Sequence, residues 1–237
     1  RRSMVMTEDE KKLTAYHEAG HAIVGLNVPQ HDPIHKATII PRGRALGLVL
    51  SLPERDQLSV TKTKYKSKLT MAMGGKVAEE MIFGPENVTS GAASDIQQIT
   101  KIARAMVTQF GMSEDLGNID YANEQQSCLG PMGGGHQSGP ETQSKIDFEV
   151  RKLVDEAYES AKKILKKHKS DLNRLAEGLL EYETLTGDEI TKVIEGKSLN
   201  RDGEDSYPDD KGPSSLASVP KAGKFKRPGE GKLSPQS

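Results

Sequence analysis

The residues Thr14-Ala15-Tyr16-His17-Glu18-Ala19-Gly20-His21-Ala22 carry the most specific pattern in this sequence, His-Glu-x-x-His within a run of helical periodicity. On a helix of about 3.6 residues per turn, His17 and His21 lie one turn apart on the same face. Two imidazoles so placed can hold one zinc ion, each with a nitrogen about 2.0–2.1 Å from the metal. Glu18 follows the first histidine directly, so its carboxylate can reach a water on that metal and act as the base of a zinc hydrolase.

The flanking residues favour a buried helix over an exposed pair of histidines. Glu and His enter a buried helix only with partners. Gly20 costs a helix about 1 kcal/mol relative to Ala, which indicates close packing at that turn. The apolar positions lie on more than one side of the helix, at Leu13, Tyr16, Ala19, Gly20, Ile23 and Val24.

The composition excludes several classes of protein. A formal net charge of −1 gives no reason to expect nucleic-acid binding. The single cysteine, Cys128, rules out an internal disulfide framework and fits a reducing compartment. No apolar run approaches the about 18 residues of a membrane span. The phosphate-binding pattern Gly-x-x-x-x-Gly-Lys-Ser/Thr does not occur.

The chain divides by composition into two parts. Residues 1–196 carry helical and strand patterns and are predicted to form one zinc metallopeptidase domain, with a flexible, glycine-rich loop at about 123–143. Residues 197–237 are dominated by Ser, Pro, Gly, Lys and Asp, with isolated apolar residues. Such a segment cannot bury enough surface to offset its ordering entropy, so it is predicted to be a disordered tail.

The predicted fold class is mainly α, with a small β-sheet near the His-Glu-x-x-His helix. Two short runs of β-forming residues, within 37–52, form that sheet. In many zinc peptidases an edge strand binds the substrate backbone, and Gly47, Leu48 and Val49 are the candidates here; a core strand without that role fits equally well. His31 and His35 follow the first helix in a polar connection and are expected to be solvated rather than to bind metal. Helices are predicted at 7–26, 61–83, 96–110 and 142–168, with shorter ones after Ser170 and Thr186.

A catalytic zinc takes three protein ligands and a water, so a third ligand is needed. Glu79 or Glu80 would give a His-His-Glu site with the third ligand on a second helix. Asp95 would supply it from the start of a helix, after the loop Asn87–Ser94. The residues alone leave these alternatives open.

Further motifs indicate a family. His17-Glu18-Ala19-Gly20-His21 is followed by Pro41-Arg42-Gly43, the run Gly75–Gly84, the run Thr89–Ile96 and Gly111-Met112-Ser113. In order and spacing these resemble the peptidase domain of the FtsH family of membrane-anchored, ATP-dependent zinc metalloproteases, over about residues 1 to 195. The resemblance implies an FtsH-type metalloprotease fold and one zinc per chain, bound by His17, His21 and Asp95. Glu79 would then accept the other N–H of a ligand histidine.

The resemblance also implies a larger protein. FtsH proteins carry transmembrane segments and an AAA ATPase module before this domain, and they form homo-hexamers that use ATP to degrade polypeptide substrates, unfolded or membrane proteins among them. We therefore expect membrane anchoring through preceding segments, with the peptidase domain in a reducing aqueous compartment. The cytoplasmic side of a bacterial inner membrane is favoured, and an organelle membrane is also compatible.

Two other functions remain open at this point. A free-standing zinc peptidase of small peptides would need no ATPase. A non-catalytic helical assembly module would have a structural metal site with four protein ligands. Glu18 beside the first histidine disfavours the second.

Overall fold

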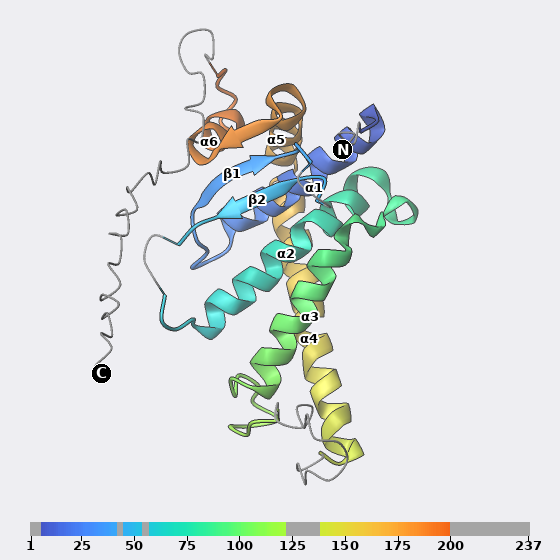
Figure 1. Cartoon of the computed structure of the whole chain (residues 1–237), viewed down its shortest axis with the longest axis vertical. Coiled ribbons are helices and arrows are strands. Elements are labelled where there is room, and N and C mark those ends of the chain that lie inside the picture. The colour runs from blue at the N-terminus through green and yellow to red at the C-terminus, as the bar shows by residue number, and fades with distance from the viewer. Residues whose placement is uncertain (1–5, 42–44, 54–56, 122–137, 200–237) are drawn as a thin grey trace, which may run out of the picture. The chain divides into compact units, whose positions relative to one another are not determined.

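A computed structural model describes residues 6–41, 45–53, 57–121 and 138–199, and within them the chain is mainly helical with a small antiparallel sheet (Figure 1). The predicted fold class is therefore confirmed. The elements in chain order are α1 (Glu8–Asn27), β1 (Ile34–Thr38), β2 (Leu48–Ser51), α2 (Lys62–Phe83), the 3₁₀ turns η1 (Pro85–Asn87) and η2 (Ser90–Ala92), α3 (Ala93–Thr108), α4 (Pro140–Lys167), α5 (Lys169–Tyr182), β3 (Thr184–Thr186) and α6 (Gly187–Ile194).

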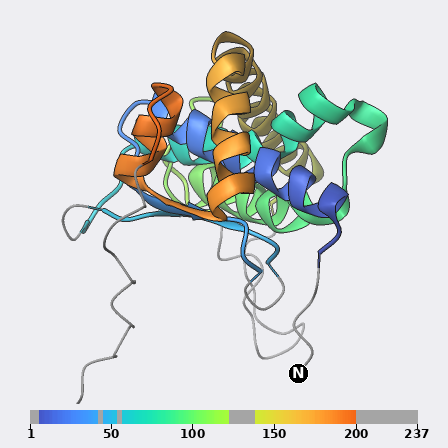
Figure 2. The same cartoon turned by 90° about the horizontal axis from the view of Figure 1, so that it is seen from above.

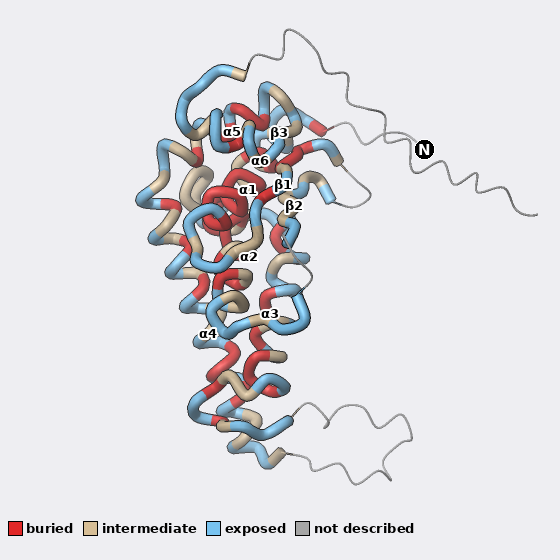
Figure 3. The backbone as a smooth tube through the Cα atoms, turned by 90° about the vertical axis from the view of Figure 1, so that its left-hand side faces the viewer, coloured by how far each residue is buried: buried red, intermediate tan, exposed pale blue. Residues whose placement is uncertain are grey.

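Helix α1 lies at the centre of these elements. It begins at a capping box, in which the Thr7 side chain accepts from the Glu10 backbone N–H and the Glu10 carboxylate accepts from the Thr7 backbone N–H. Helices α2, α4 and α5 and strands β1 and β2 all contact it. Almost every residue from Thr14 to Gly25 is buried or half-buried, as the red tube of α1 in Figure 3 shows. The expected burial of this helix on more than one side is confirmed.

Two glycines let α1 and α2 approach backbone to backbone. A Cβ on Gly74 would lie 2.6 Å from the Gly20 carbonyl oxygen, and a Cβ on Gly20 would overlap the Gly74 carbonyl in return. Any side chain at either position would therefore force the helices apart. The pair Gly74-Gly75 does not break α2, which runs unbroken from Lys62 to Phe83.

The sheet covers one side of α1, below the helices in Figure 2, with strand order β2-β1-β3. Both pairings are antiparallel, with Ala37 opposite Val49 on β2 and Leu185 on β3. Strand β3 was not expected from the sequence. Strand β1 begins at Ile34, so His35 is an exposed strand residue and not part of a loop. Strand β2 is an edge of the sheet.

Helices α3 and α4 run side by side (Figure 1). Helix α3 begins at Ala93, earlier than predicted, which puts Asp95 in its first turn. Helix α4 begins at Pro140, because proline suits the first turn of a helix, and the expected loop therefore ends before residue 143. The rest of that loop, with Cys128, falls outside the described residues, as does the expected tail from residue 200. Among the helices described, none has the length and apolar content to span a bilayer.

Candidate metal centre

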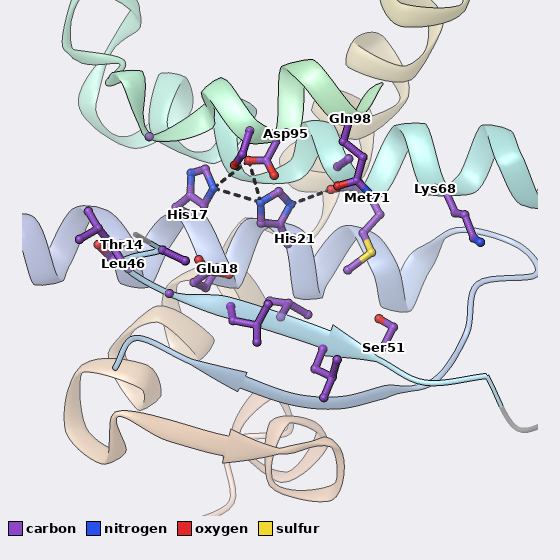
Figure 4. A pocket seen from close by; sticks show the side chains of 18 of the residues that line it. Thr14, His17, Glu18, His21, Leu46, Ser51, Lys68, Met71, Asp95 and Gln98 are labelled. Atoms are coloured by element: carbon purple, nitrogen blue, oxygen red, sulfur yellow. Dashed lines mark hydrogen bonds and ion pairs between the residues drawn. The ribbon is translucent and has the colours of Figure 1, made fainter. Parts of the chain in front are cut away.

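A cleft of about 1140 Å³ runs between α1, α2, the start of α3 and strand β2. His17, Glu18 and His21 line it from α1, and Asp95 lines it from α3 (Figure 4). All four side chains thus meet in one place, although Asp95 is 74 or more residues from the others in sequence. The cleft continues along β2 to Ser51 and along α2 to Lys68.

Three donor atoms converge at the wall of this cleft. His17 Nε2 lies 3.0 Å from His21 Nε2 and 3.2 Å from Asp95 Oδ2. His21 Nε2 lies 3.4 Å from the same Asp95 oxygen. The three side chains form the one group of potential metal ligands that the described residues contain, with ligand atoms within 4.8 Å of one another.

The remaining ring nitrogens fix which atoms face the centre. His17 Nδ1 lies 2.7 Å from Glu79 Oε1, and His21 Nδ1 lies 2.9 Å from the Met71 carbonyl oxygen. Both partners are acceptors, so each Nδ1 carries the proton that it donates. When a ring is neutral, as a metal ligand must be, its unprotonated Nε2 therefore faces the centre. Two nitrogen lone pairs and a carboxylate oxygen at such distances repel one another unless a cation lies between them, and the donor set suits zinc.

Glu79 holds His17 from a fully buried position on α2. Its second oxygen, Oε2, accepts the Thr89 backbone N–H at 2.9 Å and the Thr89 hydroxyl at 3.2 Å. Burial acts to raise the pKa of Glu79, but the hydrogen bonds from His17 and Thr89 outweigh it and hold that pKa below its usual range. Glu79 is therefore ionised, and it links α1 to the segment that leads into Asp95.

Gly75 makes room for the histidine rings. A Cβ at this position would lie 2.6 Å from both His17 Nε2 and His21 Nε2. A side chain on α2 here would fill the space at which the donor atoms meet. Gly74 and Gly75 thus serve different purposes, one for helix packing and one for the centre.

Glu18 points into the cleft beside this centre and is itself largely buried. The segment before β2 packs directly on it, since a Cβ on Gly47 would lie 2.5 Å from Glu18 Oε1. Burial raises the pKa of Glu18, although the nearby His21 and His17 act in the opposite direction. A carboxylate with a raised pKa accepts and returns protons more readily near neutral pH.

The electrostatics of the centre favour a positive charge. Burial lowers the pKa of His17, but hydrogen bonds to Asp95 and Glu79 and the charge of Glu18 outweigh it and raise that pKa to about 10. Burial acts to raise the pKa of Asp95, but hydrogen bonds from His17 and His21 outweigh it and hold that pKa well below its usual range. A metal ion that occupies this centre must displace a proton from it.

The residues expected at the site lie as follows. His17, His21, Asp95, Glu18 and Glu79 are together, and the same cleft is lined by Leu48 and Val49 of the edge strand and by Gly47 just before it. The alternative ligand Glu80 points elsewhere, to Lys76 and Tyr158. His31 is half-buried and lines the cleft, so it is less exposed than expected, and it is not in the group of potential metal ligands found among the described residues.

Sequence reasoning missed the contributions of Thr89 and Met71. A backbone carbonyl such as that of Met71 gives no signal in the sequence. The capping residue Thr89, just before a glycine-containing turn, was recognisable as a turn residue but not as a partner of Glu79.

Comparison with known proteins places this chain in a family. The model of peptidase family M41 matches residues 4–193. The chain is 47% identical over 208 residues to an ATP-dependent zinc metalloprotease FtsH of Rickettsia bellii, covering 88% of this chain and 33% of that protein. It is 51% identical over 208 residues to the protein of the same name from Caulobacter vibrioides, covering 87% of this chain and 33% of that protein.

A plant relative is similar to the same degree. The ATP-dependent zinc metalloprotease FTSH 11, chloroplastic/mitochondrial, of Arabidopsis thaliana is 48% identical over 194 residues, which cover 82% of this chain and 22% of that protein. The chain thus spans about a third of the length of its bacterial relatives and less of the plant one. It belongs to peptidase family M41, the family of the FtsH metalloprotease domains that its motifs resemble.

Proposed function

We propose that this chain is the zinc-dependent endopeptidase domain of an ATP-dependent FtsH protease. The observation that carries the proposal is the convergence of His17 Nε2, His21 Nε2 and Asp95 Oδ2 beside Glu18 in an open cleft. The relatives are named zinc metalloproteases, and this donor set suits the same metal.

In this proposal His17, His21 and Asp95 are the metal ligands, with one zinc per chain. The bond from His17 Nδ1 to Glu79 keeps the ring in the tautomer that presents Nε2. When bound, zinc supplies a Lewis acid that polarises the scissile carbonyl and lowers the pKa of a water.

Glu18 is the proposed general base and acid. Its carboxylate accepts a proton from the attacking water and then delivers that proton to the nitrogen of the leaving amine, so the proton balance of peptide hydrolysis closes. Its burial under the Gly47 segment keeps the carboxylate in one place and shields it from bulk solvent.

The edge strand β2 is the proposed substrate-binding element. An extended polypeptide that adds to an edge strand is held by backbone hydrogen bonds, which are largely independent of sequence. Gly47, Leu48 and Val49 line the cleft next to Glu18 and are therefore the residues that such a chain would meet first.

The rival functions fit less well. A structural zinc site has four protein ligands, whereas the described residues place three around an open cleft. A free-standing peptidase of small peptides remains chemically compatible with the site, but the similarity to much longer ATP-dependent relatives favours the larger assembly.

We also propose, from the family resemblance, that the complete protein is a membrane-anchored homo-hexamer whose AAA module uses ATP to deliver polypeptide substrates, including membrane proteins under quality control. The relatives come from bacteria and from plant chloroplasts or mitochondria. The cytoplasmic side of a bacterial inner membrane is the proposed location.

If the peptidase domains assemble unaided, sedimentation velocity at micromolar concentration will detect a hexamer. A purely monomeric sample would count against assembly by this domain.

The ligand set is tested by zinc affinity in a chelator competition titration. Asp95→Asn is expected to lose most zinc binding, because it removes a ligand. Glu79→Gln should lower the zinc affinity indirectly, by about 10- to 100-fold, because it weakens the hydrogen bond that orients His17.

Glu80→Gln is the matched control for Glu79→Gln, since the neighbouring carboxylate faces Lys76 and Tyr158 instead of the centre. Its zinc affinity should equal that of the wild type. Loss of zinc in Glu79→Gln with full retention in Asp95→Asn would show that the third ligand is a glutamate, and the proposed set would be wrong.

The role of Glu18 is tested by comparing metal content with turnover. Glu18→Gln should retain one zinc per chain, because Glu18 is not a ligand, while cleavage of casein or a peptide falls by at least about 10²–10⁴-fold, the usual contribution of a general base. Zinc content is measured on the sample used for the assay. Turnover near the wild-type rate in a pure, zinc-loaded sample would exclude Glu18 as the base.

A further inference from the structure

The end of the cleft remote from the metal centre carries a lysine for which the described residues supply no ion pair. Lys68 on α2 lines this end, together with Ser51 at the end of β2 (Figure 4). The ion pairs found in the described parts of the chain do not include Lys68, whose Nζ lies over the Tyr65 ring, 5.9 Å from the ring centre. Such a contact leaves an ammonium group free to bind an anion.

The neighbouring charges do not neutralise Lys68. Asp32 lines the same end, but its carboxylate is 2.5 Å from Lys64 Nζ and also accepts from Gln57 at 2.9 Å. Asp32 is therefore already paired with Lys64, and among the described residues of this region one Asp and two Lys sum to a net charge of +1.

His31 adds no charge to this end of the cleft. Its Nδ1–H donates to the Asp32 carbonyl oxygen at 2.7 Å. Burial lowers the pKa of His31, and the charges of Lys64 and Lys68 lower it further against the effect of Asp32. The imidazole is therefore neutral at pH 7, so within the described part of the chain the uncompensated charge here is that of Lys68.

Ser51 offers a second polar group at the same end. Its Oγ is buried and, within the chain segments that the structure describes, has no hydrogen-bond partner. Buried hydroxyl groups without a partner are uncommon, and those that occur call for an explanation. The hydroxyl is covered in this conformation, so an acceptor in the cleft would become its partner after rotation about the Ser51 Cα–Cβ bond.

The two ends of the cleft thus differ in charge. Glu18, Glu79 and Asp95 gather at the metal centre, whereas Lys68 is the unmatched charge at the other end. Ser51 is the last residue of β2 and lies four residues after Gly47, which precedes the strand and packs on Glu18. At about 3.3 Å per residue, that is about 13 Å of extended chain.

We propose that Lys68 and Ser51 form a subsite for a carboxylate of the bound polypeptide, about three to five residues from the scissile bond. This rests on the proposed peptidase function and adds a preference to it. The carboxylate belongs to an Asp or Glu side chain or to the end of the polypeptide chain. Lys68 sets the preference, because an ammonium group pairs with a carboxylate by a charge-assisted hydrogen bond.

The preference is measured with pairs of peptides that differ only by Glu or Gln, three to five residues to either side of one scissile bond, with both ends blocked. At one position the zinc-loaded wild type should cleave the Glu peptide with a kcat/KM about three- to tenfold higher, as for a partly exposed ion pair. Lys68→Met should equalise the two peptides, Lys68→Glu should invert the preference, and Lys68→Arg should keep it. A Gln peptide with a free C-terminal carboxylate is compared with the same peptide blocked at that end. If only this pair shows a kcat/KM difference that depends on Lys68, the carboxylate bound is that of the chain end.

Lys66→Met is the matched control, because Lys66 lies on the same helix but pairs with Glu156 on α4 at 3.0 Å and does not line the cleft. This variant should keep the wild-type preference. The subsite would be overturned if Glu and Gln peptides had equal kcat/KM at every position, whether the C-terminus is blocked or free. A preference that survives Lys68→Met would overturn it as well. Either result leaves the peptidase function intact.

A binding measurement separates the subsite from catalysis. Fluorescence anisotropy with zinc-loaded Glu18→Gln reports the Kd of each uncleaved peptide, with and without Lys68→Met. A Lys68-dependent preference for the carboxylate peptide in this binding assay, together with no cleavage of any peptide by the zinc-loaded wild type, would uphold the subsite and reject the peptidase function. No preference in either assay would reject the subsite.

Discussion

The geometry of the candidate metal centre depends on the hydrogen bond from His17 to Glu79, which connects α1 to α2. Its donor is on α1 and its acceptor on α2, and the other oxygen of Glu79 is bound by Thr89, just before α3. A fully buried carboxylate is costly unless its charge and lone pairs are matched, and here three N–H and O–H groups match them. This one side chain therefore links α1, α2 and the segment that leads into α3.

The glycines of α1 and α2 make that hydrogen bond possible. Contact at Gly20 and Gly74 brings the two helices closer than side chains would allow, and Gly75 leaves space for both imidazoles. On α2, which also carries Gly74 and Gly75, the Met71 carbonyl oxygen accepts the hydrogen bond from His21 Nδ1. Close helix packing is thus a condition for the chemistry of the site, because it sets where both ring nitrogens point.

Much of the site could be predicted from the sequence, because its central pattern is local. The spacing of His17 and His21 places both on one face of a helix whatever the rest of the chain does. The capping boxes at Thr7 and Thr186 are also local, and both are present. The choice between Asp95 and Glu79 was different, since periodicity says nothing about which distant carboxylate reaches the histidines, and only the family resemblance favoured Asp95.

What the sequence did not predict depends on contacts between distant segments. Strand β3 is three residues long and exists because Thr184–Thr186 pairs with β1, nearly 150 positions earlier. The cleft beyond the centre likewise joins α2, β2 and the segment that follows α1, so the position of His31 and the unmatched charge of Lys68 could not be read from either stretch alone.

The central claim is that Glu79 and the Met71 carbonyl fix both proposed ligand histidines, His17 and His21, with Nδ1 protonated and Nε2 facing the metal. Nitrogen–proton correlation spectra of the histidine rings in the zinc-loaded protein test this most directly, because they distinguish protonated, free and metal-bound ring nitrogens. The account predicts a protonated Nδ1 and a metal-bound Nε2 in both His17 and His21. A protonated Nε2, or a metal-bound Nδ1, in either ring would contradict it.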